Sequence, residues 1–175
     1  MTVILAALKE EFHHEDYSAM THYSGVGKVN VAMKATEVIL SPYYRPECII
    51  NVGTVGALNP GMSGLYECGI FQDRDLPKEF NPEMLVTDDT KCICSTGDNF
   101  LENKDSINEE YPPDLVDMEA FAIATVCREY NVKFVCYKFV TDYVNQESSD
   151  DWKKNIGKGN SLFKEKLDGY FSNSV

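Results

Sequence analysis

The sequence is poor in positive charge. Its 175 residues contain 16 Lys and Arg against 28 Asp and Glu, which gives a formal net charge of −12. Proteins that bind DNA or RNA use basic patches to neutralise phosphate groups, and anionic membrane surfaces attract basic segments for the same reason. The composition therefore argues against nucleic acid and membrane partners, whereas a small-molecule ligand remains open.

Long apolar runs are also missing. No apolar segment approaches the roughly 20 residues of a membrane-spanning helix. The first residues, MTVILAALKEEF, turn acidic too soon for a signal peptide, so we expect a cytoplasmic protein. Internal repeats and low-complexity segments are absent from the sequence. A length of 175 residues with 43% hydrophobic content predicts one globular domain spanning residues 1–175.

A metal-ligand pattern is missing as well. The six cysteines and three histidines show no spacing typical of a zinc site, and the pair Cys92-x-Cys94 is isolated. Most of the cysteines lie in apolar runs such as ECIINVG (47–53) and VKFVCYKFV (132–140), where buried free thiols are common in cytosolic proteins. We therefore expect no metal site.

Apolar runs and helical periodicities alternate along the chain. Strands are predicted where short runs are rich in β-branched residues, and helices where apolar residues recur every three or four positions. The expected strands are 2–8, 20–27, 46–53, 64–71, 91–97 and 132–142, and the expected helices are 27–40, 118–130 and roughly 150–172. The predicted core face of the first helix consists of Val29, Ala32, Met33, Thr36, Ile39 and Leu40, and that of the last consists of Leu162, Phe163, Leu167, Tyr170 and Phe171.

This alternation predicts the fold class. Continuous apolar strands that alternate with helices indicate a central sheet covered on both faces. We therefore predict an α/β fold, a three-layer α/β/α sandwich with a central mixed sheet. The polar, Pro-containing segment 73–91 is predicted to be an irregular loop.

Candidate ligand-binding residues follow the predicted strands. In α/β folds, ligands bind at the carboxyl ends of the strands. Glycines, carboxylates and one aromatic residue gather at these ends, and none of them is specific by itself: Glu10, Glu11, Gly25, Gly27, Gly53, Thr54, Gly56, Thr96, Gly97, Asp98, Asn99, Phe100, Thr141 and Asp142.

The stretch DLVDMEAF (114–121) places two more carboxylates, Asp117 and Glu119, at the entry to an apolar helix. Taken alone, both have a structural explanation. Asp117 can be the helix N-cap, and Glu119 can lie in the first turn, where the helix dipole favours negative charge. A functional role for either residue therefore depends on the rest of the chain.

Six blocks of the sequence, in a fixed order, carry a family resemblance. They are LAALKEEF (5–12), GVGKVNVA (25–32), NVGTVGAL (51–58), STGDNF (95–100), VDMEAFAIATVC (116–127) and FVTD (139–142). The set resembles the purine nucleoside phosphorylase/uridine phosphorylase superfamily, and within it the 5′-methylthioadenosine/S-adenosylhomocysteine nucleosidases. This resemblance implies a nucleoside phosphorylase-like fold and hydrolysis of the N-glycosidic bond of an adenine nucleoside. It implies no cofactor, and a homodimer is among the expected assemblies.

The resemblance implies roles for three carboxylates. Asp142 would protonate the leaving purine, Glu11 would activate water, and Glu119 would bind the ribose 2′- and 3′-hydroxyls. The role of Glu119 is chemically sound because an ionised carboxylate only accepts hydrogen bonds and a diol offers two donors. Asp142 follows an apolar strand, an environment that raises the pKa of a carboxyl group. Asp117 keeps the capping role.

The resemblance also implies substrate contacts. Phe100 would stack on the purine, with Leu101 beside it supplying backbone contacts. Met118 would pack on the ribose, and Thr54 would lie near the sugar and the nucleophile. Lys138 stands where many nucleosidases have arginine, which weakens its match to a water-positioning role. The remaining expected substrate-binding residues are Gly56 and Thr141.

Two alternatives remain open: a phosphate-dependent purine nucleoside phosphorylase and a non-catalytic nucleoside-binding protein. A phosphorylase needs basic residues to hold phosphate. The first loop carries Glu10 and Glu11 instead, which favours water, although Arg74 could support phosphate. The presence of all three carboxylates argues against a purely binding role. The chain is shorter than the superfamily by roughly a quarter of a typical domain, so the resemblance predicts the 5′ pocket and the dimer contact least well.

Overall fold

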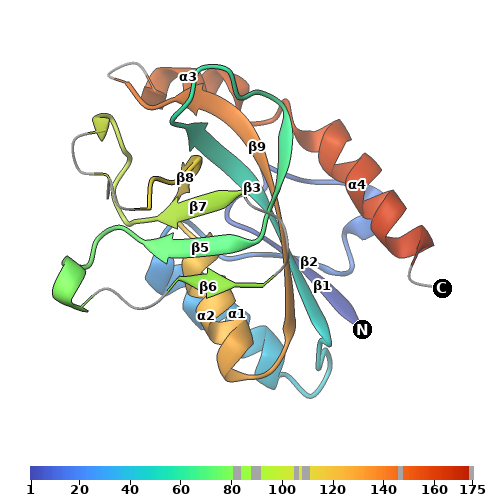
Figure 1. The fold of residues 1–175 in the computed structure, drawn as a ribbon. Coiled ribbons are helices and arrows are strands. Elements are labelled where there is room, and N and C mark those ends of the chain that lie inside the picture. Colours follow the sequence, from blue (N-terminus) through green and yellow to red (C-terminus); the bar gives the residue numbers. More distant parts are fainter. Residues whose placement is uncertain (81–83, 88–91, 105–106, 108–110, 146–147, 174–175) are drawn as a thin grey trace.

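The computed structural model describes residues 1–80, 84–87, 92–104, 107, 111–145 and 148–173 (Figure 1). The strands are β1 (Thr2–Ala6), β2 (Thr21–Tyr23), β3 (Cys48–Ala57), β4 (Leu65–Cys68), β5 (Ile70–Asp73), β6 (Leu85–Val86), β7 (Ile93–Thr96), β8 (Leu115–Asp117) and β9 (Lys133–Tyr143). The α-helices are α1 (Lys28–Leu40), α2 (Ala120–Glu129), α3 (Ser148–Asn155) and α4 (Asn160–Ser172). Two short 3-10 helices are η1 (Glu15–Tyr17) and η2 (Lys78–Phe80).

The described strands form one mixed sheet in the order β2-β1-β3-β8-β7-β5-β6, with β9 paired to β3 and β4. Strand β3 organises this sheet. Along one edge it pairs with the parallel strand β9 over its whole length. On its other edge, residues 48–51 pair with parallel β1, and residues 56 and 57 pair with antiparallel β8. Residues 52–55 lie where β3 changes from one partner to the other.

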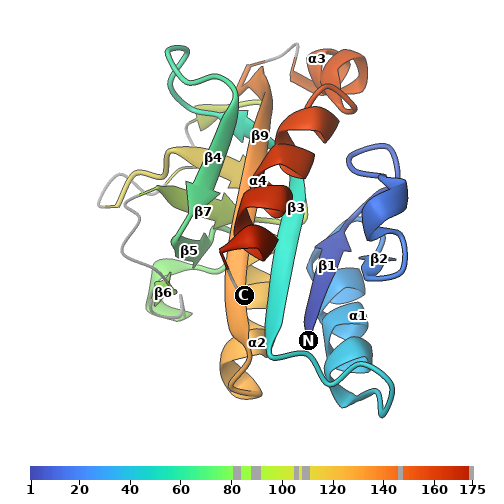
Figure 2. The same cartoon turned by 90° about the vertical axis from the view of Figure 1, so that its right-hand side faces the viewer.

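The sheet is buried on both faces, and β1 shows how. Val3 and Leu5 belong to a core that includes residues of α1 and α2. Ile4 and Ala6 point the opposite way, because side chains alternate along a strand, and they belong to a second core with residues of α4. Figure 2 shows α4 on one side of the sheet and α1 and α2 on the other. The predicted three-layer α/β/α sandwich with a mixed sheet is confirmed.

The predicted core face of α1 is wrong in part. Val29, Met33 and Leu40 are exposed, with 69%, 68% and 62% of their surface accessible. The buried residues of the helix are Val31, Ala35 and Val38, with Ala32 and Ile39 partly buried beside them. The helix has apolar residues on two stripes, and the periodicity alone does not tell which stripe meets the sheet.

The predicted helix over roughly 150–172 is two helices, α3 and α4, because the chain turns at residues 156–159. Gly159 explains why the chain can turn so close to the sheet. A Cβ atom at this position would lie 2.7 Å from Cγ of Phe139 in β9, which is far inside van der Waals contact. Of the predicted stripe, Phe163 and Leu167 are buried in the second core.

Two further predictions differ from the structure. The expected strand 64–71 is divided between β4 and β5, with the break at Gly69, so that β4 pairs with β9 and β5 pairs with β7. The expected loop 73–91 contains η2 and β6, while its residues 81–83 and 88–91 lie outside the described part of the chain.

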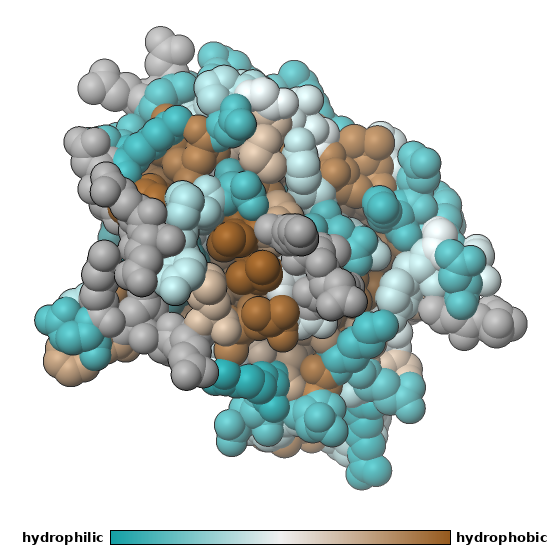
Figure 3. Space-filling view, viewed as in Figure 1, coloured by the Kyte–Doolittle hydropathy of each residue, from teal (hydrophilic) through white to brown (hydrophobic). Residues whose placement is uncertain are grey.

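Figure 3 shows apolar side chains set among hydrophilic ones on the face seen in Figure 1. Of the described helices, none has the length and apolar character that crossing a membrane requires.

Candidate active site

A cavity of about 260 Å³ opens where β1, β3 and β9 end and where β8 leads into α2. Pockets of this kind, mainly apolar with a few polar groups, bind small ligands. Most of the site residues predicted from the sequence line this cavity: Glu11, Thr54, Gly56, Phe100, Leu101, Met118, Glu119 and Asp142.

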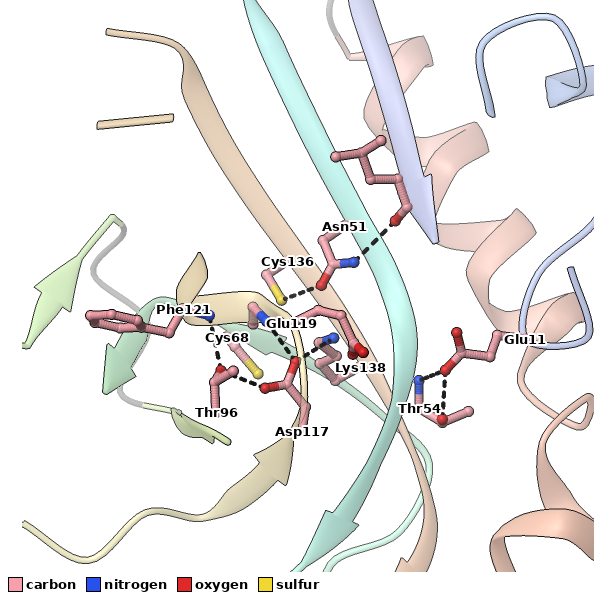
Figure 4. Close-up of polar contacts among 12 residues, drawn as sticks. Glu11, Asn51, Thr54, Cys68, Thr96, Asp117, Glu119, Phe121, Cys136 and Lys138 are labelled. Carbon is pink, nitrogen blue, oxygen red and sulfur yellow. Dashed lines mark hydrogen bonds and ion pairs between the residues drawn. The ribbon is translucent and has the colours of Figure 1, made fainter. Parts of the chain in front are cut away.

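Glu11 reaches the cavity from the loop that follows β1, and the residue is only 5% exposed. Its Oε1 atom accepts hydrogen bonds from the Thr54 backbone N–H (2.9 Å) and from the Thr54 hydroxyl (2.6 Å). Its Oε2 atom accepts one from the Leu8 backbone N–H at 3.1 Å. Donors on both oxygen atoms fix the carboxylate in one orientation. Figure 4 shows the two bonds from Thr54.

Glu119 lies between β8 and α2, at the N-cap position of the helix, but its side chain makes no capping hydrogen bond. Its Oε1 instead accepts a hydrogen bond from the backbone N–H of Gly27, at 2.9 Å, across the cavity rim. Burial and the nearby charge of Asp117 raise the pKa of Glu119 to about 8, against the opposing effect of Lys138. The carboxylate of Glu119 therefore does not simply face the first turn of α2, as the helix-dipole explanation would require, but contacts the loop before α1.

Asp142 lies near the end of β9, and its Oδ1 accepts a hydrogen bond from the Thr141 hydroxyl at 2.8 Å. Burial raises its pKa to about 6, although the Thr141 hydroxyl lowers it. Gly56 on the neighbouring strand leaves room for this carboxylate, since a Cβ atom at that position would lie 2.9 Å from Asp142 Oδ2. The predicted contact residue Gly56 thus has a steric role beside the carboxyl group.

Asp117, which lines the cavity, forms a buried ion pair with Lys138 behind it, with 2.8 Å between Lys138 Nζ and Asp117 Oδ2. Asp117 also accepts hydrogen bonds from the hydroxyl of Thr96 (2.5 Å) and from the backbone N–H of Ala120 (2.8 Å), so it does bind the first turn of α2 as predicted (Figure 4). Burial disfavours both charges, but their mutual attraction outweighs it, lowering the pKa of Asp117 and raising that of Lys138.

Two predicted contact residues are therefore not part of the cavity wall in the described chain. Lys138 is 1% exposed and directs its ammonium group to Asp117. The hydroxyl of Thr141 contacts the carbonyl of Val55 (3.3 Å) and the carboxylate of Asp142. Both residues lie one layer behind the groups that face the cavity.

The cavity wall also contains residues whose roles the sequence did not predict. Trp152 of α3 donates from its indole Nε1–H to the Thr54 hydroxyl at 2.9 Å, and its ring lies edge-on to Phe100 with centroids 6.3 Å apart. As the only tryptophan of the chain, Trp152 could have been singled out, but it lies outside the six blocks.

Arg74 is the second such residue. Its guanidinium group donates to four backbone carbonyls: those of Ser95 (2.6 Å), Asp117 (2.8 Å), Gly97 (3.3 Å) and Asn99 (2.7 Å). It therefore ties the end of β7 and its following loop to the end of β8, which holds Phe100 and Glu119 on the same side of the site.

Among the described residues, no group of three or more His, Cys, Asp or Glu side chains is arranged to hold a metal ion. The acidic groups of the cavity are instead bonded to N–H and O–H donors, as described above. The arrangement suits acid–base chemistry on a neutral organic ligand.

Comparison with known proteins gives a consistent result. The sequence pattern of the phosphorylase superfamily matches residues 86–171. A Bacillus thuringiensis 5′-methylthioadenosine/S-adenosylhomocysteine nucleosidase is 32% identical over 165 residues, covering 72% of this chain and 68% of the relative. The fold is similar to that of a mutant Helicobacter pylori nucleosidase with 5′-methylthioadenosine in its active site, with a TM-score of 0.82, 18% identity, and coverage of 96% and 98% of the two chains. It is also similar to that of Helicobacter pylori futalosine hydrolase, with a TM-score of 0.78, 18% identity, and coverage of 90% and 92%.

The 32% identical relative, together with the matched sequence pattern, defines the chain as a member of the phosphorylase superfamily, and the fold agrees with this class. Within that superfamily, the chain belongs to the family of 5′-methylthioadenosine/S-adenosylhomocysteine nucleosidases.

Proposed function

We propose that the protein hydrolyses the N-glycosidic bond of an adenine nucleoside such as 5′-methylthioadenosine or S-adenosylhomocysteine and releases the base. The observation that carries this proposal is the convergence of Glu11, Glu119 and Asp142 on one mainly apolar cavity from three separate strand ends. The family to which the chain belongs supports the same substrate class.

Asp142 is the proposed general acid. Cleavage of the bond leaves negative charge on the departing purine unless a proton is delivered to its N7 atom. Burial raises the pKa of Asp142 to about 6, so a useful fraction of the side chain carries a proton near neutral pH. The hydroxyl of Thr141 fixes the orientation of the carboxyl group by donating to Oδ1.

Glu11 is the proposed general base for water. Its Oε1 is occupied by two donors from Thr54, whereas Oε2 receives the long 3.1 Å bond from Leu8. Oε2 is therefore the atom better able to accept a proton from a water molecule in the cavity.

Glu119 is the proposed ligand of the ribose hydroxyls. Among the described residues, the Gly27 N–H is the one hydrogen-bond donor to its carboxylate, the residue is 7% exposed, and its pKa is raised to about 8. Two hydroxyl donors from a bound ribose would stabilise its ionised form. Phe100 and Met118 line the same cavity and are the proposed contacts of the purine and the sugar.

Water rather than phosphate is the proposed nucleophile, because three basic side chains near this edge of the sheet are already engaged. Arg74 donates to four backbone carbonyls, Lys138 pairs with Asp117, and Lys28 pairs with Asp73 (3.0 Å) and Asp75 (2.8 Å). A phosphate ion would have to compete with these partners for each charge.

We also propose that the protein acts as a homodimer in the cytoplasm. Val29, Met33 and Leu40 give α1 an exposed apolar stripe that a second copy would cover. All six cysteines are free thiols, which suits a reducing compartment. Met33→Glu should shift the sedimentation coefficient toward the monomer, whereas Val86→Glu, which changes an equally exposed residue at 68%, should not. An unchanged coefficient for Met33→Glu would refute the α1 interface.

The activity is tested by incubating the protein with a nucleoside panel, with and without phosphate, and identifying the sugar product. We expect free ribose sugar at a rate independent of phosphate. Glu11→Gln should lose roughly two to four orders of magnitude in turnover, while Glu10→Gln, the exposed neighbour, serves as the matched control and should stay near wild type. Ribose 1-phosphate as the main product would contradict the proposal.

A further inference from the structure

A chain of three side chains connects helix α3 to the candidate base. The indole Nε1–H of Trp152 donates to Thr54 Oγ1 at 2.9 Å, and Thr54 Oγ1–H donates to Glu11 Oε1 at 2.6 Å. Glu11 is 5% exposed and Thr54 is 8% exposed, so both bonds are shielded from bulk water. These contacts join residues that are far apart in the sequence, because α3 packs against β9 beside β3 (Figure 2).

The direction of this chain follows from the chemistry of its members. An indole N–H can only donate, and a threonine hydroxyl has one proton. With Trp152 donating to its oxygen, the Thr54 hydroxyl must direct its single proton to the best remaining acceptor, which is Glu11 Oε1. The indole bond also polarises the hydroxyl, because hydrogen bonds in series strengthen one another in a low-dielectric site.

We infer that Trp152 is a positioning residue for Glu11, acting through Thr54; this inference deepens the proposed hydrolase function and rests on it. Trp152 holds the hydroxyl proton of Thr54 on Oε1, which stabilises the ionised form of Glu11 and leaves Oε2 to accept the proton of the attacking water. The edge-on contact of Trp152 with Phe100 places the same indole beside the residue proposed to stack on the base.

Helix α3 is held in place by a second bond, which keeps the indole in position. Asn155, in the last turn of α3, donates from Nδ2 to the backbone carbonyl of Thr141 at 2.7 Å. Thr141 in turn donates its hydroxyl to Asp142. One short helix therefore contacts the neighbours of both the candidate base and the candidate acid.

The kinetic test compares Trp152→Phe with Thr54→Val and with the double variant. Phe keeps the aromatic packing but lacks the N–H group. We expect Trp152→Phe to lower kcat by roughly 3- to 10-fold, the scale of one hydrogen bond. KM should stay within about twofold, because the ring still packs on Phe100.

The pH dependence separates positioning from packing. The acidic limb of the kcat profile should move to higher pH in Trp152→Phe, because the ionised carboxylate loses support. The other charged groups around Glu11 and Trp152 are unchanged by the substitution, so they do not account for such a movement: Asp117, Glu119, Lys138, Asp142, Asp150, Asp151 and Lys153.

The double variant tests whether the two bonds act in series. Once Thr54→Val has removed the hydroxyl, the indole has nothing to orient, so the added Trp152→Phe should cost no further activity. Losses that multiply, a wild-type pH profile in Trp152→Phe, or an effect confined to KM would each overturn the inference and leave Trp152 as a packing residue.

A second measurement does not depend on turnover or on the folding of Trp152→Phe. Because the chain has one tryptophan, its indole N–H gives one resonance in a proton–nitrogen correlation spectrum. Thr54→Val should move this resonance upfield and speed its exchange with solvent, and Glu11→Gln should also move it. An unmoved resonance in both variants would overturn the inference. If the resonance moves in these variants but the wild-type protein cleaves no nucleoside, the hydrogen-bonded chain is supported and the proposed function is refuted.

Discussion

Replacing Asp142 by Asn should make the protein slower and, at neutral pH, more stable. Burial raises the pKa of Asp142 from 3.8 to about 6. At pH 7 roughly a tenth of the carboxyl groups are then protonated, against fewer than about one in a thousand at the ordinary value. This is a gain of more than about a hundredfold in the acid form, and the Asn variant forfeits it together with the transferable proton. We expect turnover to fall by roughly two to four orders of magnitude.

The stability effect has the opposite sign. A carboxyl group whose pKa is higher in the folded state than in the unfolded state binds its proton more tightly when folded. Its ionisation therefore weakens the fold as the pH rises from 3.8 to about 6, and the cost is fully present at pH 7. Allowing for screening by water in the cavity, Asp142→Asn should raise the free energy of unfolding by about 1–2 kcal/mol at pH 7.

Urea unfolding at two pH values checks this reasoning. The stabilisation of the Asn variant should be present at pH 7 and largely lost by about pH 4, where the wild-type carboxyl is protonated in the folded state. An equal difference at both pH values would show that ionisation of Asp142 is not its source. Near-normal turnover of the variant would remove Asp142 from the reaction altogether.

Other substitutions test the same site. Asp117→Ala leaves the buried ammonium group of Lys138 without its partner, so the free energy of unfolding in urea should fall by about 3–5 kcal/mol, rather than by the roughly 1 kcal/mol of a lost cap. Adding Lys138→Met to this variant should recover most of that loss. Glu119→Gln should reduce turnover of ribosides far more than of 2′-deoxyribosides; equal losses on both sugars in parallel kinetic assays would make Glu119 a structural residue. Because the pKa of Glu119 is raised to about 8, nucleoside binding at pH 7 should release protons, and calorimetry in two buffers of different ionisation enthalpy should show this for the wild type only. Gly56→Ala would place a methyl group 2.9 Å from Asp142 Oδ2 and 3.2 Å from Val116 Cγ2, so kcat should fall and overpacking should lower the unfolding free energy by about 1–3 kcal/mol; unchanged kcat would show that Asp142 has room to move.

The fold was largely predictable because its central strands consist mainly of apolar residues, many of them β-branched. β3 and β9 are buried along most of their length and need no information from distant residues to be recognised. The buried face of α1 was not predictable in the same way. Val29, Met33 and Leu40 are as apolar as Val31 and Val38, and only packing against the sheet distinguishes the two stripes.

The site shows a similar division. Glu11 follows β1 and Asp142 lies near the end of β9, and both strands run parallel to β3, so their carboxyl ends meet at one edge of the sheet. Glu119 follows β8, which runs antiparallel to β3, so its place in the cavity wall does not follow from the same rule. The partners of these residues do not follow from motifs. Lys138 meets Asp117 across the sheet, and Trp152 reaches Thr54 only because the chain folds back through α3. Such contacts depend on tertiary packing, which no local pattern encodes.

The change of partner along β3 has a consequence for how the site keeps its dimensions. Residues 52–55 of β3 lie between the part paired with β1 and the part paired with β8, so their backbone groups on this edge are not used by the sheet. The N–H of Thr54 donates to Glu11 instead. Two residues further on, Gly56 makes room for Asp142. Three consecutive residues of one buried strand, Thr54 to Gly56, therefore determine the spacing between the proposed base and the proposed acid. Changes in the length of the loops around the cavity rim would leave this spacing unaltered.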